Sequence, residues 1–279
     1  MSGRAFIVVG WDGSPNSVAA LDCALVEAGV RDARLVLCHV RERSSRGGDH
    51  ARAGAARQLL ARGAERAHRR VPGIDVTRRL LTGSPARQLL RVADGARLLV
   101  VGARGTSTSH ELRLGPVSDH ITRHRHRAVL VVPDAGSRAG VARHRTVVVG
   151  VDGSGDSAAA LRFAFEEAVR RRTAVRVIHV VDPSTSPAGH VPHRQPRRRR
   201  ITAADTMREL LVEYAARWPS VRVCAEVRSG VPGVALAAAA DGAELLVLGT
   251  HKHHDTDPLT RGVTRCAVLH NATCPVAII

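Results

Sequence analysis

A chain of 279 residues is long enough for two domains of ordinary size. Hydrophobic residues make up 44% of it and aromatic residues only 2%, so we expect cores built from valine, leucine, isoleucine and alanine. No apolar run reaches the roughly 18 residues that would indicate a transmembrane helix. The first residues lead into a strand-like run without a signal-peptide pattern. We therefore expect a soluble, cytoplasmic protein with no membrane partner.

The formal net charge of +17 favours an anionic partner. Most arginines are scattered along predicted helix faces, and the one continuous run is Arg197–Arg200, which we expect in a surface loop. Specific nucleic-acid binding favours aromatic stacking residues beside the basic ones, and these are scarce here. The five cysteines show no C-x-x-C spacing, so they are predicted to be reduced and buried rather than metal ligands.

Apolar runs alternate with helical patterns through the first half of the chain. Ala5–Gly10 predicts a strand buried on both faces, and Ser14 is the expected N-cap of a helix that begins with Pro15 and reaches about Ala28. Further strands are expected at Leu35–Val40, Ile74–Leu81, Leu98–Val101 and Ala128–Val132, and further helices at His50–Arg70, from Pro85 onward and at Gly115–Arg125. Strands that alternate with helices predict a parallel sheet covered on both faces.

The same pattern is then written a second time. The segment VVGWDGS from Val8 returns as VVGVDGS from Val148, 140 residues later, and ADGARLLVVG from Ala93 returns as ADGAELLVLG from Ala240, 147 residues later. The second copy therefore holds seven more residues between its second and third strands, which we expect to form a surface loop. The predicted organisation is a domain, a linker and a domain, at residues 1–135, 136–145 and 146–279.

The ligand crevice of such a sheet lies at the carboxyl ends of the strands, where the strand order reverses. Asp12 follows the first strand, and the pattern Gly102-x-x-Gly105, nine residues and Gly115 follows the fourth. Glycines at positions 102 and 105 allow positive φ and a close approach of the backbone to a phosphate. Gly115 begins the next helix, whose free N–H groups and dipole favour an anion.

These motifs resemble the universal stress protein family. The pattern G-x-x-G-x9-G together with V-x-V-D-G-S after the first strand carries the resemblance, which covers nearly the whole chain once per copy. It implies Rossmann-like domains of the adenine nucleotide alpha hydrolase-like type. Each would be a five-stranded parallel sheet with strand order 3-2-1-4-5. In one branch of the family it also implies ATP binding, for which we expect Mg²⁺ as the companion ion.

By the same resemblance, Asp12 would hydrogen-bond the adenine or ribose region, Val40 would line the adenine pocket, and the three glycines would hold the phosphates. The first copy departs at Pro116, where the family has serine or threonine; Ser118 could partly compensate, and Arg104 could contact phosphate. The candidate binding residues are Asp12, Gly13, Ser14, Val40, Gly102, Arg104, Gly105, Gly115, Pro116, Val117 and Ser118.

The second copy departs further. Lys252 replaces the second glycine and Val263 the hydroxyl residue, so we expect the second copy to bind nucleotide weakly or not at all. The weaker candidate set is Asp152, Gly153, Ser154, Val180, Gly249, Lys252, Gly262, Val263 and Thr264. No metal site is expected: His251, His253, His254 and Asp255 read as a solvated loop, and His120 and His124 as ordinary surface histidines on one helix face.

The leading hypothesis is a non-catalytic, ATP-binding regulatory protein of the stress response. No nucleophile motif, metal-binding motif or Walker loop is present, although slow ATP hydrolysis stays open. The first alternative is a nucleotide-independent interaction module with vestigial sites, and the second is nucleic-acid binding through the basic loop at residues 194–200. We expect the two copies to pair as an intramolecular pseudo-dimer through their fifth strands, Ala128–Val132 and Val276–Ile279, and a further homodimer is possible.

Overall fold

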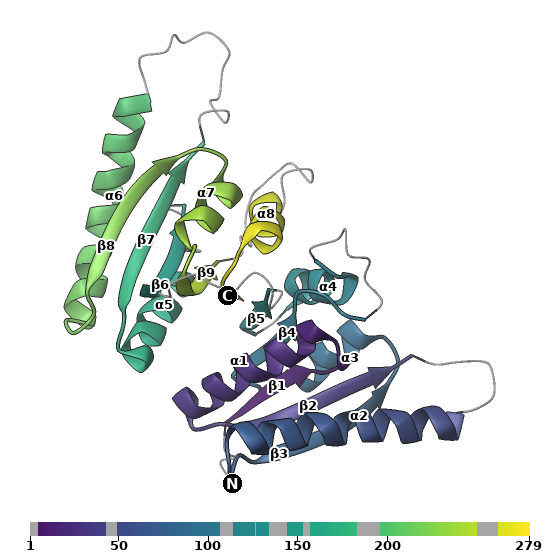
Figure 1. The fold of residues 1–279 in the computed structure, drawn as a ribbon. Helices are drawn as coiled ribbons and strands as arrows, with labels where there is room; N and C mark the ends of the chain where they lie inside the picture. Colours follow the sequence, from purple (N-terminus) through teal and green to yellow (C-terminus); the bar gives the residue numbers. More distant parts are fainter. Residues whose placement is uncertain are drawn as a thin grey trace. The chain divides into compact units, whose positions relative to one another are not determined.

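The computed structural model describes residues 5–42, 49–106, 114–125, 127–133, 144–152, 157–182, 196–249 and 262–279. The chain forms two compact units, Met1–Ala139 and Gly140–Ile279 (Figure 1). Within the described part of the chain, no helix is long and apolar enough to cross a membrane.

The first unit is a parallel sheet with helices on both faces. Its strands lie in the order β3-β2-β1-β4-β5, which confirms the predicted topology. Helices α1 and α2 pack on one face, and α3 and α4 on the other. The elements are β1 Phe6–Gly10, α1 Pro15–Arg31, β2 Arg34–Arg41, α2 Asp49–Arg70, β3 Val76–Thr82, α3 Pro85–Val92, β4 Leu98–Gly102, α4 Pro116–His124 and β5 Val129–Val132.

The second unit repeats this arrangement. Its strands lie in the order β8-β7-β6-β9-β10, and all of its ladders are parallel. Helices α5 and α6 share one face, and α7 and α8 pack on each other. The elements are β6 His144–Val151, α5 Ser157–Arg171, β7 Ala174–Val181, α6 Pro196–Arg217, β8 Val223–Ser229, α7 Pro232–Ala239, β9 Ala243–Leu248, α8 Val263–Asn271 and β10 Val276–Ile278.

The central strands form the core of each unit. Ile7, Val8 and Val9 of β1 are completely buried, as are Val147 and Val148 of β6. Because helices cover both faces of the sheet, these strands have no solvent face, and their sequences are continuous apolar runs. Aliphatic side chains therefore dominate both cores, as the composition predicted.

Two features of the fold differ from the sequence reading. The run Arg197–Arg200 lies in the first turns of α6, so the prediction of a basic loop is wrong at these residues. Pro196 fixes a φ suited to the first helical position, and arginine is a good helix former, which explains why the helix begins there. The periodicity also gave no sign of two buried carboxylates, Glu27 in α1 and Glu167 in α5, which are 2% and 0% exposed.

Each buried glutamate is paired within its own helix. Glu27 accepts a hydrogen bond from Arg31, one turn later. Glu167 occupies the corresponding position 140 residues on and pairs with Arg170 at 2.9 Å and with Arg171 at 3.2 Å. A buried carboxylate requires such partners because its desolvation is costly. The ion pair is thus a repeated element of both units.

Candidate functional site

The loop after β1 is organised around Asp12. Gly13 has a φ of +77°, and a Cβ there would lie 2.7 Å from Cδ1 of Leu59 in α2, so only glycine fits this turn. Ser14 caps α1 by accepting a hydrogen bond at Oγ from the N–H of Ser17 at 3.1 Å. Pro15 then occupies the first helical position, as predicted. The chain therefore leaves β1 along one fixed path, which places Asp12 at the carboxyl edge of the sheet.

The Asp12 carboxylate joins the loops that follow β1 and β4. Its Oδ1 accepts a hydrogen bond from the N–H of Ser14 at 3.0 Å, and its Oδ2 accepts one from the N–H of Thr106 at 2.9 Å. Burial raises the pKa of Asp12, but hydrogen bonds from Ser14, Thr106 and Ser17 together lower the pKa below its ordinary value. The side chain is therefore held in position as a carboxylate.

The glycines after β4 serve close packing. A Cβ on Gly102 would lie 2.8 Å from the backbone and Cβ of Asn16 in α1, and a Cβ on Gly105 would lie 2.7 Å from Oδ2 of Asp12. Neither glycine has a positive φ, so a left-handed backbone is not what requires glycine at these two positions. The physical reason is that α1 and the Asp12 side chain approach the end of β4 too closely for any side chain there.

The start of α4 has fewer free donors than the resemblance implies. Gly115 is the N-cap, with φ −80° and ψ 159°, and its N–H donates to the carbonyl of Ala103 at 2.7 Å. Pro116 has no N–H. Ser118 is 4% exposed, and its hydroxyl donates to the carbonyl of Gly102 at 2.6 Å. The donors that remain without an intrahelical partner in this turn are the backbone N–H groups of Val117 and Ser118.

Three further residues complete the picture of the first unit. Val40 is half-buried near the end of β2, and Arg104 is half-buried in the loop after β4. His39, next to Val40, places its Nδ1 2.7 Å from the carbonyl oxygen of Trp11, so this ring nitrogen donates a hydrogen bond. The bond ties the end of β2 to the residue before Asp12. His179 makes the same bond to Val151 at 3.0 Å in the second unit.

Asn16 is a residue of this edge that sequence reasoning missed. It lies in the first turn of α1, is 6% exposed, and contacts the end of β4 at Gly102. Its Oδ1 is buried and has no hydrogen-bond partner. Such atoms are rare in folded proteins because the lost hydrogen bond is costly. No local sequence pattern marks Asn16, because its environment is created by the contact between α1 and the end of β4.

The second unit keeps one part of this arrangement. Asp152 follows β6, and its Oδ1 accepts a hydrogen bond from the buried hydroxyl of Ser157 at 2.7 Å. Gly262, at the start of α8, has a φ of +82°, unlike the extended Gly115. Val263, which follows it, is 53% exposed.

The other candidates of the second unit are partly described. Gly249 directly follows β9, Val180 lies near the end of β7, and Thr264 is half-buried in the first turn of α8. Several predicted residues fall outside the described part of the chain: Gly153, Ser154, Lys252, His251, His253, His254 and Asp255.

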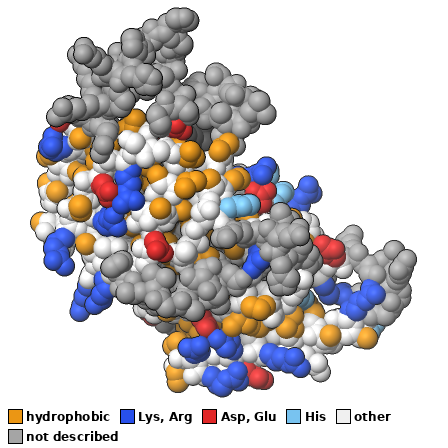
Figure 2. Space-filling view, turned by 45° about the horizontal axis from the view of Figure 1, so that its top comes forward, with side chains coloured by type: hydrophobic (Ala, Val, Ile, Leu, Met, Phe, Trp, Pro, Cys, Tyr) orange, Lys and Arg blue, Asp and Glu red, His pale blue; other side chains and the backbone are white. Residues whose placement is uncertain are grey.

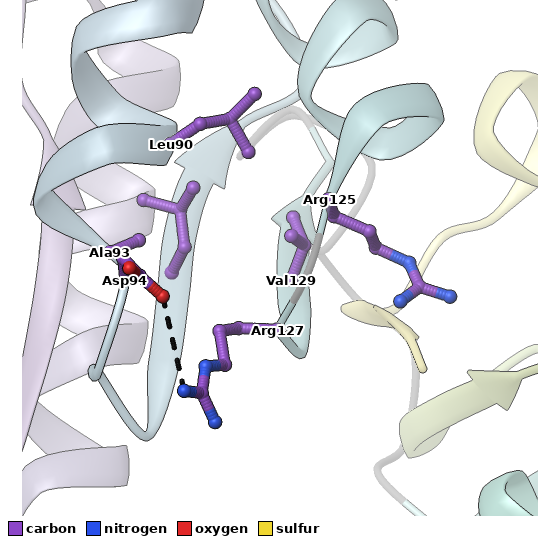
Figure 3. A pocket seen from close by; sticks show the side chains of 7 residues that line it. Leu90, Ala93, Asp94, Arg125, Arg127 and Val129 are labelled. Carbon is purple, nitrogen blue, oxygen red and sulfur yellow. Dashed lines mark ion pairs between the residues drawn. The ribbon is translucent and has the colours of Figure 1, made fainter.

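A small hollow lies at the opposite edge of the first sheet. Leu90 and Ala93 from the end of α3 and Val129 from the start of β5 line it (Figure 3). Arg127 turns toward Asp94 there and pairs with it at 3.9 Å. Because these residues lie at the amino ends of β4 and β5, the hollow is separate from the Asp12 edge.

Basic side chains are spread over the described surface. On the face drawn in Figure 2, arginine side chains lie in several separate groups with acidic and apolar side chains between them. Tyr214 of α6 and Trp218, which directly follows this helix, pack against Phe165 of α5, with ring centroids 5.4 and 5.3 Å from its ring. Both side chains are half-exposed at the outer side of this contact.

A pair of tandem doubly wound domains with an acidic residue after the first strand of each defines the class of protein. The family model described as "Universal stress protein family" matches residues 6–133 and 143–279. The chain therefore belongs to the universal stress protein family, once per unit. This confirms the resemblance drawn from the Asp12 and glycine-loop motifs.

Relatives and solved structures agree with this assignment. The chain is 28% identical to a universal stress protein of Mycolicibacterium smegmatis, with 98% of this chain and 96% of the relative covered. It is 26% identical to one of Mycobacterium tuberculosis over the same shares. The crystal structure of a universal stress protein from Archaeoglobus fulgidus matches with a TM-score of 0.70 at 18% identity, covering 98% of this chain and 95% of that one. This last similarity supports the fold.

Proposed function

We propose that the first unit binds ATP, accompanied by Mg²⁺, and that the protein is a non-catalytic regulator in the stress response. The observation that carries the proposal is the Asp12 carboxylate. Two backbone N–H groups from different loops hold it at the carboxyl ends of β1 and β4, the edge where doubly wound sheets bind ligands. Membership of the universal stress protein family supports the stress-response role.

The residues present fit an adenine nucleotide at this edge. Each Asp12 oxygen has a lone pair beyond the one that accepts a backbone N–H, and these can accept from ribose hydroxyl groups or the adenine amino group. Val40 supplies an apolar contact for the base. The N–H groups of Val117 and Ser118, with the dipole of α4, can bind phosphate oxygens. Arg104 can add a charged contact, and Mg²⁺ would neutralise phosphate charge.

Binding without efficient catalysis follows from the same geometry. A general base works best with a pKa near the working pH. Hydrogen bonds hold the pKa of Asp12 below its ordinary value, so the carboxylate is a weak base. We therefore propose at most slow hydrolysis in the first unit.

We propose weaker binding in the second unit. Asp152 lies at the matching edge of that sheet, but the residue after the helix-initiating glycine is Val263 and position 252 carries lysine. The matching position in the first unit, Gly105, has no room for a side chain beside Asp12. A lysine in such a place would have to displace the neighbouring carboxylate.

Calorimetric titration of the full chain with Mg-ATP tests the proposal. We expect saturable binding that Gly105→Ala weakens by about tenfold or more, equivalent to ~1.4 kcal/mol, because the added Cβ displaces Asp12. Asp152→Asn is the matched control in the second unit and should change the affinity less than about twofold. Absence of saturable binding to the wild-type chain, or unchanged binding by Gly105→Ala, would contradict the proposal.

One observation favours a second function, a nucleotide-independent interaction module. In the first turn of α4, the N–H of Gly115 and the hydroxyl of Ser118 are already used within the protein, and Pro116 offers no N–H. If the site is vestigial, excess Mg-ATP should leave the thermal stability of the chain unchanged. A ligand at 100 times its dissociation constant would instead stabilise the protein by about 2.7 kcal/mol.

A further inference from the structure

Helix α2 has a strongly basic exposed side. Its buried residues, among them Leu60 and Ala67, recur at helical spacing and face the sheet, and its arginines lie at other positions of the helix. The helix holds six arginines, all exposed except the half-buried Arg66: Arg52, Arg57, Arg62, Arg66, Arg69 and Arg70. Its acidic residues are Asp49 and Glu65. Six positive charges against two give this one helix a formal charge of +4.

Few carboxylates neutralise these arginines. Asp22 of α1 pairs with Arg66 at 2.6 Å and with Arg70 at 3.3 Å. Glu65 lies 4.0 Å from Arg69, and because these side chains are 65% and 70% exposed, water weakens their attraction. In the part of the chain that the structure describes, three arginines of α2 have no ion pair: Arg52, Arg57 and Arg62. We call these three, together with Arg69, the basic surface of α2.

The corresponding helix of the second unit lacks this charge over most of its length. Positions 57, 62, 66 and 69 of α2 correspond, 147 residues later, to Ala204, Glu209, Glu213 and Ala216 of α6. Helix α6 nevertheless forms, and it packs on β7 and β8 as α2 packs on β2 and β3. The arginines at positions 57, 62 and 69 are therefore not needed for a helix at this place in the fold. Their charge points to a contact outside the unit.

The edge strand next to α2 extends the basic surface. Arg78 of β3 is exposed and is paired in register with Leu37 of β2. Residues paired in a parallel ladder point to the same face of the sheet, and Leu37 lies beside Gly63 of α2, where a Cβ would be 2.8 Å from its Cδ2. Arg78 thus lies on the side of the sheet that α2 covers, whereas the matching position of β8 carries Ala225.

The side chains between these arginines narrow the class of partner. The exposed neighbours within α2 are small or polar: Ala51, Ala55, Gln58, Glu65 and His68. Large exposed hydrophobic side chains occur elsewhere in the described residues, but none of them lies in α2. A protein interface has an apolar centre, and a helix that binds a membrane surface inserts apolar side chains, so neither partner fits this surface well. Guanidinium groups instead bind phosphate through charge-assisted, two-bond contacts.

We propose that the basic surface of α2 binds a nucleic-acid duplex through its phosphate backbone, without reading its sequence. From Arg52 to Arg69 the helix rises by about 26 Å, less than the ~34 Å of one duplex turn. A duplex carries one negative charge per ~1.7 Å of its axis, so several arginines along this length meet phosphates at once. Because its bases stay stacked, the contact needs none of the aromatic side chains that single-strand binding uses. None of these arginines belongs to the proposed ATP site, so the proposal does not rest on it.

The test is fluorescence anisotropy of the full chain with labelled DNA and RNA duplexes of about 20 base pairs, roughly two turns. We expect saturable binding whose logarithmic affinity falls linearly as the logarithm of the salt concentration rises. The triple variant Arg57→Ala, Arg62→Glu and Arg69→Ala places the residues of α6 in α2, so the helix should fold normally by circular dichroism. At ~100 mM NaCl it should bind at least about tenfold more weakly, with a salt slope less steep by about 2–3, since each lost phosphate contact removes about 1.

The matched control is the triple variant Arg87→Ala, Arg91→Ala and Arg97→Glu. Arg87 and Arg91 lie in α3 on the other face of the sheet, Arg97 directly precedes β4, and all three are exposed. Both triple variants lower the net charge by four, one for each alanine and two for the glutamate. The control should weaken binding less than about threefold, because charges more than ~10 Å from the contact are largely screened at this salt concentration.

Three results would overturn the proposal. They are equal weakening of duplex binding by the two triple variants, tighter binding of a single strand than of a duplex of the same length, and binding of phosphatidylserine vesicles but of neither duplex. Binding of either duplex with the expected loss in the α2 variant supports the proposal, and the duplex that binds more tightly identifies the source of the phosphates.

Discussion

Helix α2, which packs on β2 and β3 of the first unit, contacts its neighbours through different residue pairs from those of its counterpart, α6, in the second unit. In α2, Gly63 leaves room for Trp11: a Cβ on Gly63 would lie 2.9 Å from Cε2 of the indole, whose Nε1 donates to the carbonyl of Leu59 at 2.9 Å. The matching positions in the second unit are Val151 and Leu210. The first unit thus has the larger residue after its first strand and glycine on the helix. The second unit has the smaller valine at the strand position and leucine on the helix.

Two more contacts between these helices show the same exchange. Asp22 of α1 forms a two-bond ion pair with Arg66 of α2, at 2.9 and 2.6 Å, whereas the matching positions carry Arg162 and Glu213. Phe165 of α5 makes tilted ring contacts with Tyr214 and Trp218, whereas the matching positions of the first unit carry the smaller residues Leu25, Ala67 and Val71. The strands and their order are therefore the same in both units. The residue pairs between the two helices differ at both members of each pair.

The carboxyl edges of the two sheets have diverged in a different way. In the helix packing, a change on one side is matched by a change on the other. In α4 and α8, which follow β4 and β9, Pro116 and Val263 stand where the family resemblance implies a serine or threonine, and no described neighbour has changed to match. In the helix packing, a substitution at one position is therefore matched by one at its partner position. At the carboxyl edge of the sheets, no such matching is found among the described residues. The comparison teaches that both units maintain the fold, whereas the residues at the proposed nucleotide edge differ between them.

The largest expected effect concerns the buried glutamate–arginine ion pair that both units contain. Glu167→Ala should destabilise the second unit by about 3–5 kcal/mol, because it leaves Arg171, whose side chain is 10% exposed, without its carboxylate. Glu27→Ala should do the same in the first unit. Urea unfolding followed by fluorescence in variants that keep only Trp218 or only Trp11 reports the two units separately. Glu166→Ala, at a more exposed carboxylate paired with Arg170, is the control and should cost less than about 1 kcal/mol.

The exchange of large and small residues predicts an effect of intermediate size. Gly63→Leu alone should destabilise the first unit by about 1–3 kcal/mol, because the added side chain overlaps Trp11 and Leu37. Adding Trp11→Val, the residue of the second unit, should recover at least half of that loss. A double-mutant cycle in urea measures the coupling. Strictly additive changes would show that the two positions do not share one space.

The exchange of charges predicts a smaller effect. Hydrogen bonding to Asp22 raises the pKa of Arg66, and both side chains are about 30% exposed. Asp22→Arg alone should destabilise the first unit by about 1 kcal/mol, since it places two guanidinium groups together. The double variant with Arg66→Glu should return to within about 0.5 kcal/mol of the wild type. If the double variant is no more stable than the single one, the ion pair does not attach α2.

The smallest expected effect is a pH dependence. The pKa of Asp12 is lower in the folded protein than its ordinary value, so its contribution to stability is present above about pH 4 and is lost as the pH falls through the folded pKa. The difference in unfolding free energy between the wild type and Asp12→Asn should therefore be constant from pH 7 to about 5 and should shrink below about pH 4. A difference that grows on acidification would contradict the assigned sign.

Much of this structure could be predicted from the sequence because its signals are local or repeated. Continuous apolar runs mark the strands, Ser14 and Pro15 mark a helix start, and the two copies support each other. The residues after each first strand, Asp12 and Asp152, could be placed at the sheet edge from topology alone.

The rest depended on contacts between distant segments. Gly102 and Gly105 are required because α1 and Asp12 come close to them, which no local pattern shows. The same holds for Asn16 and for the buried Glu27 and Glu167, whose polar character suggested exposed helix positions. The Ser118 hydroxyl was expected to help bind phosphate, but it donates its hydrogen bond to the carbonyl of Gly102 at the end of β4.

The central claim is that one chain holds one nucleotide, in its first unit. Equilibrium dialysis of the full chain against labelled Mg-ATP measures this most directly. We predict saturation at one ATP per chain, loss of that ATP in Asp12→Asn combined with Gly105→Ala, and its retention in Asp152→Asn. Saturation at two per chain, or loss of the ATP in Asp152→Asn alone, would contradict the account.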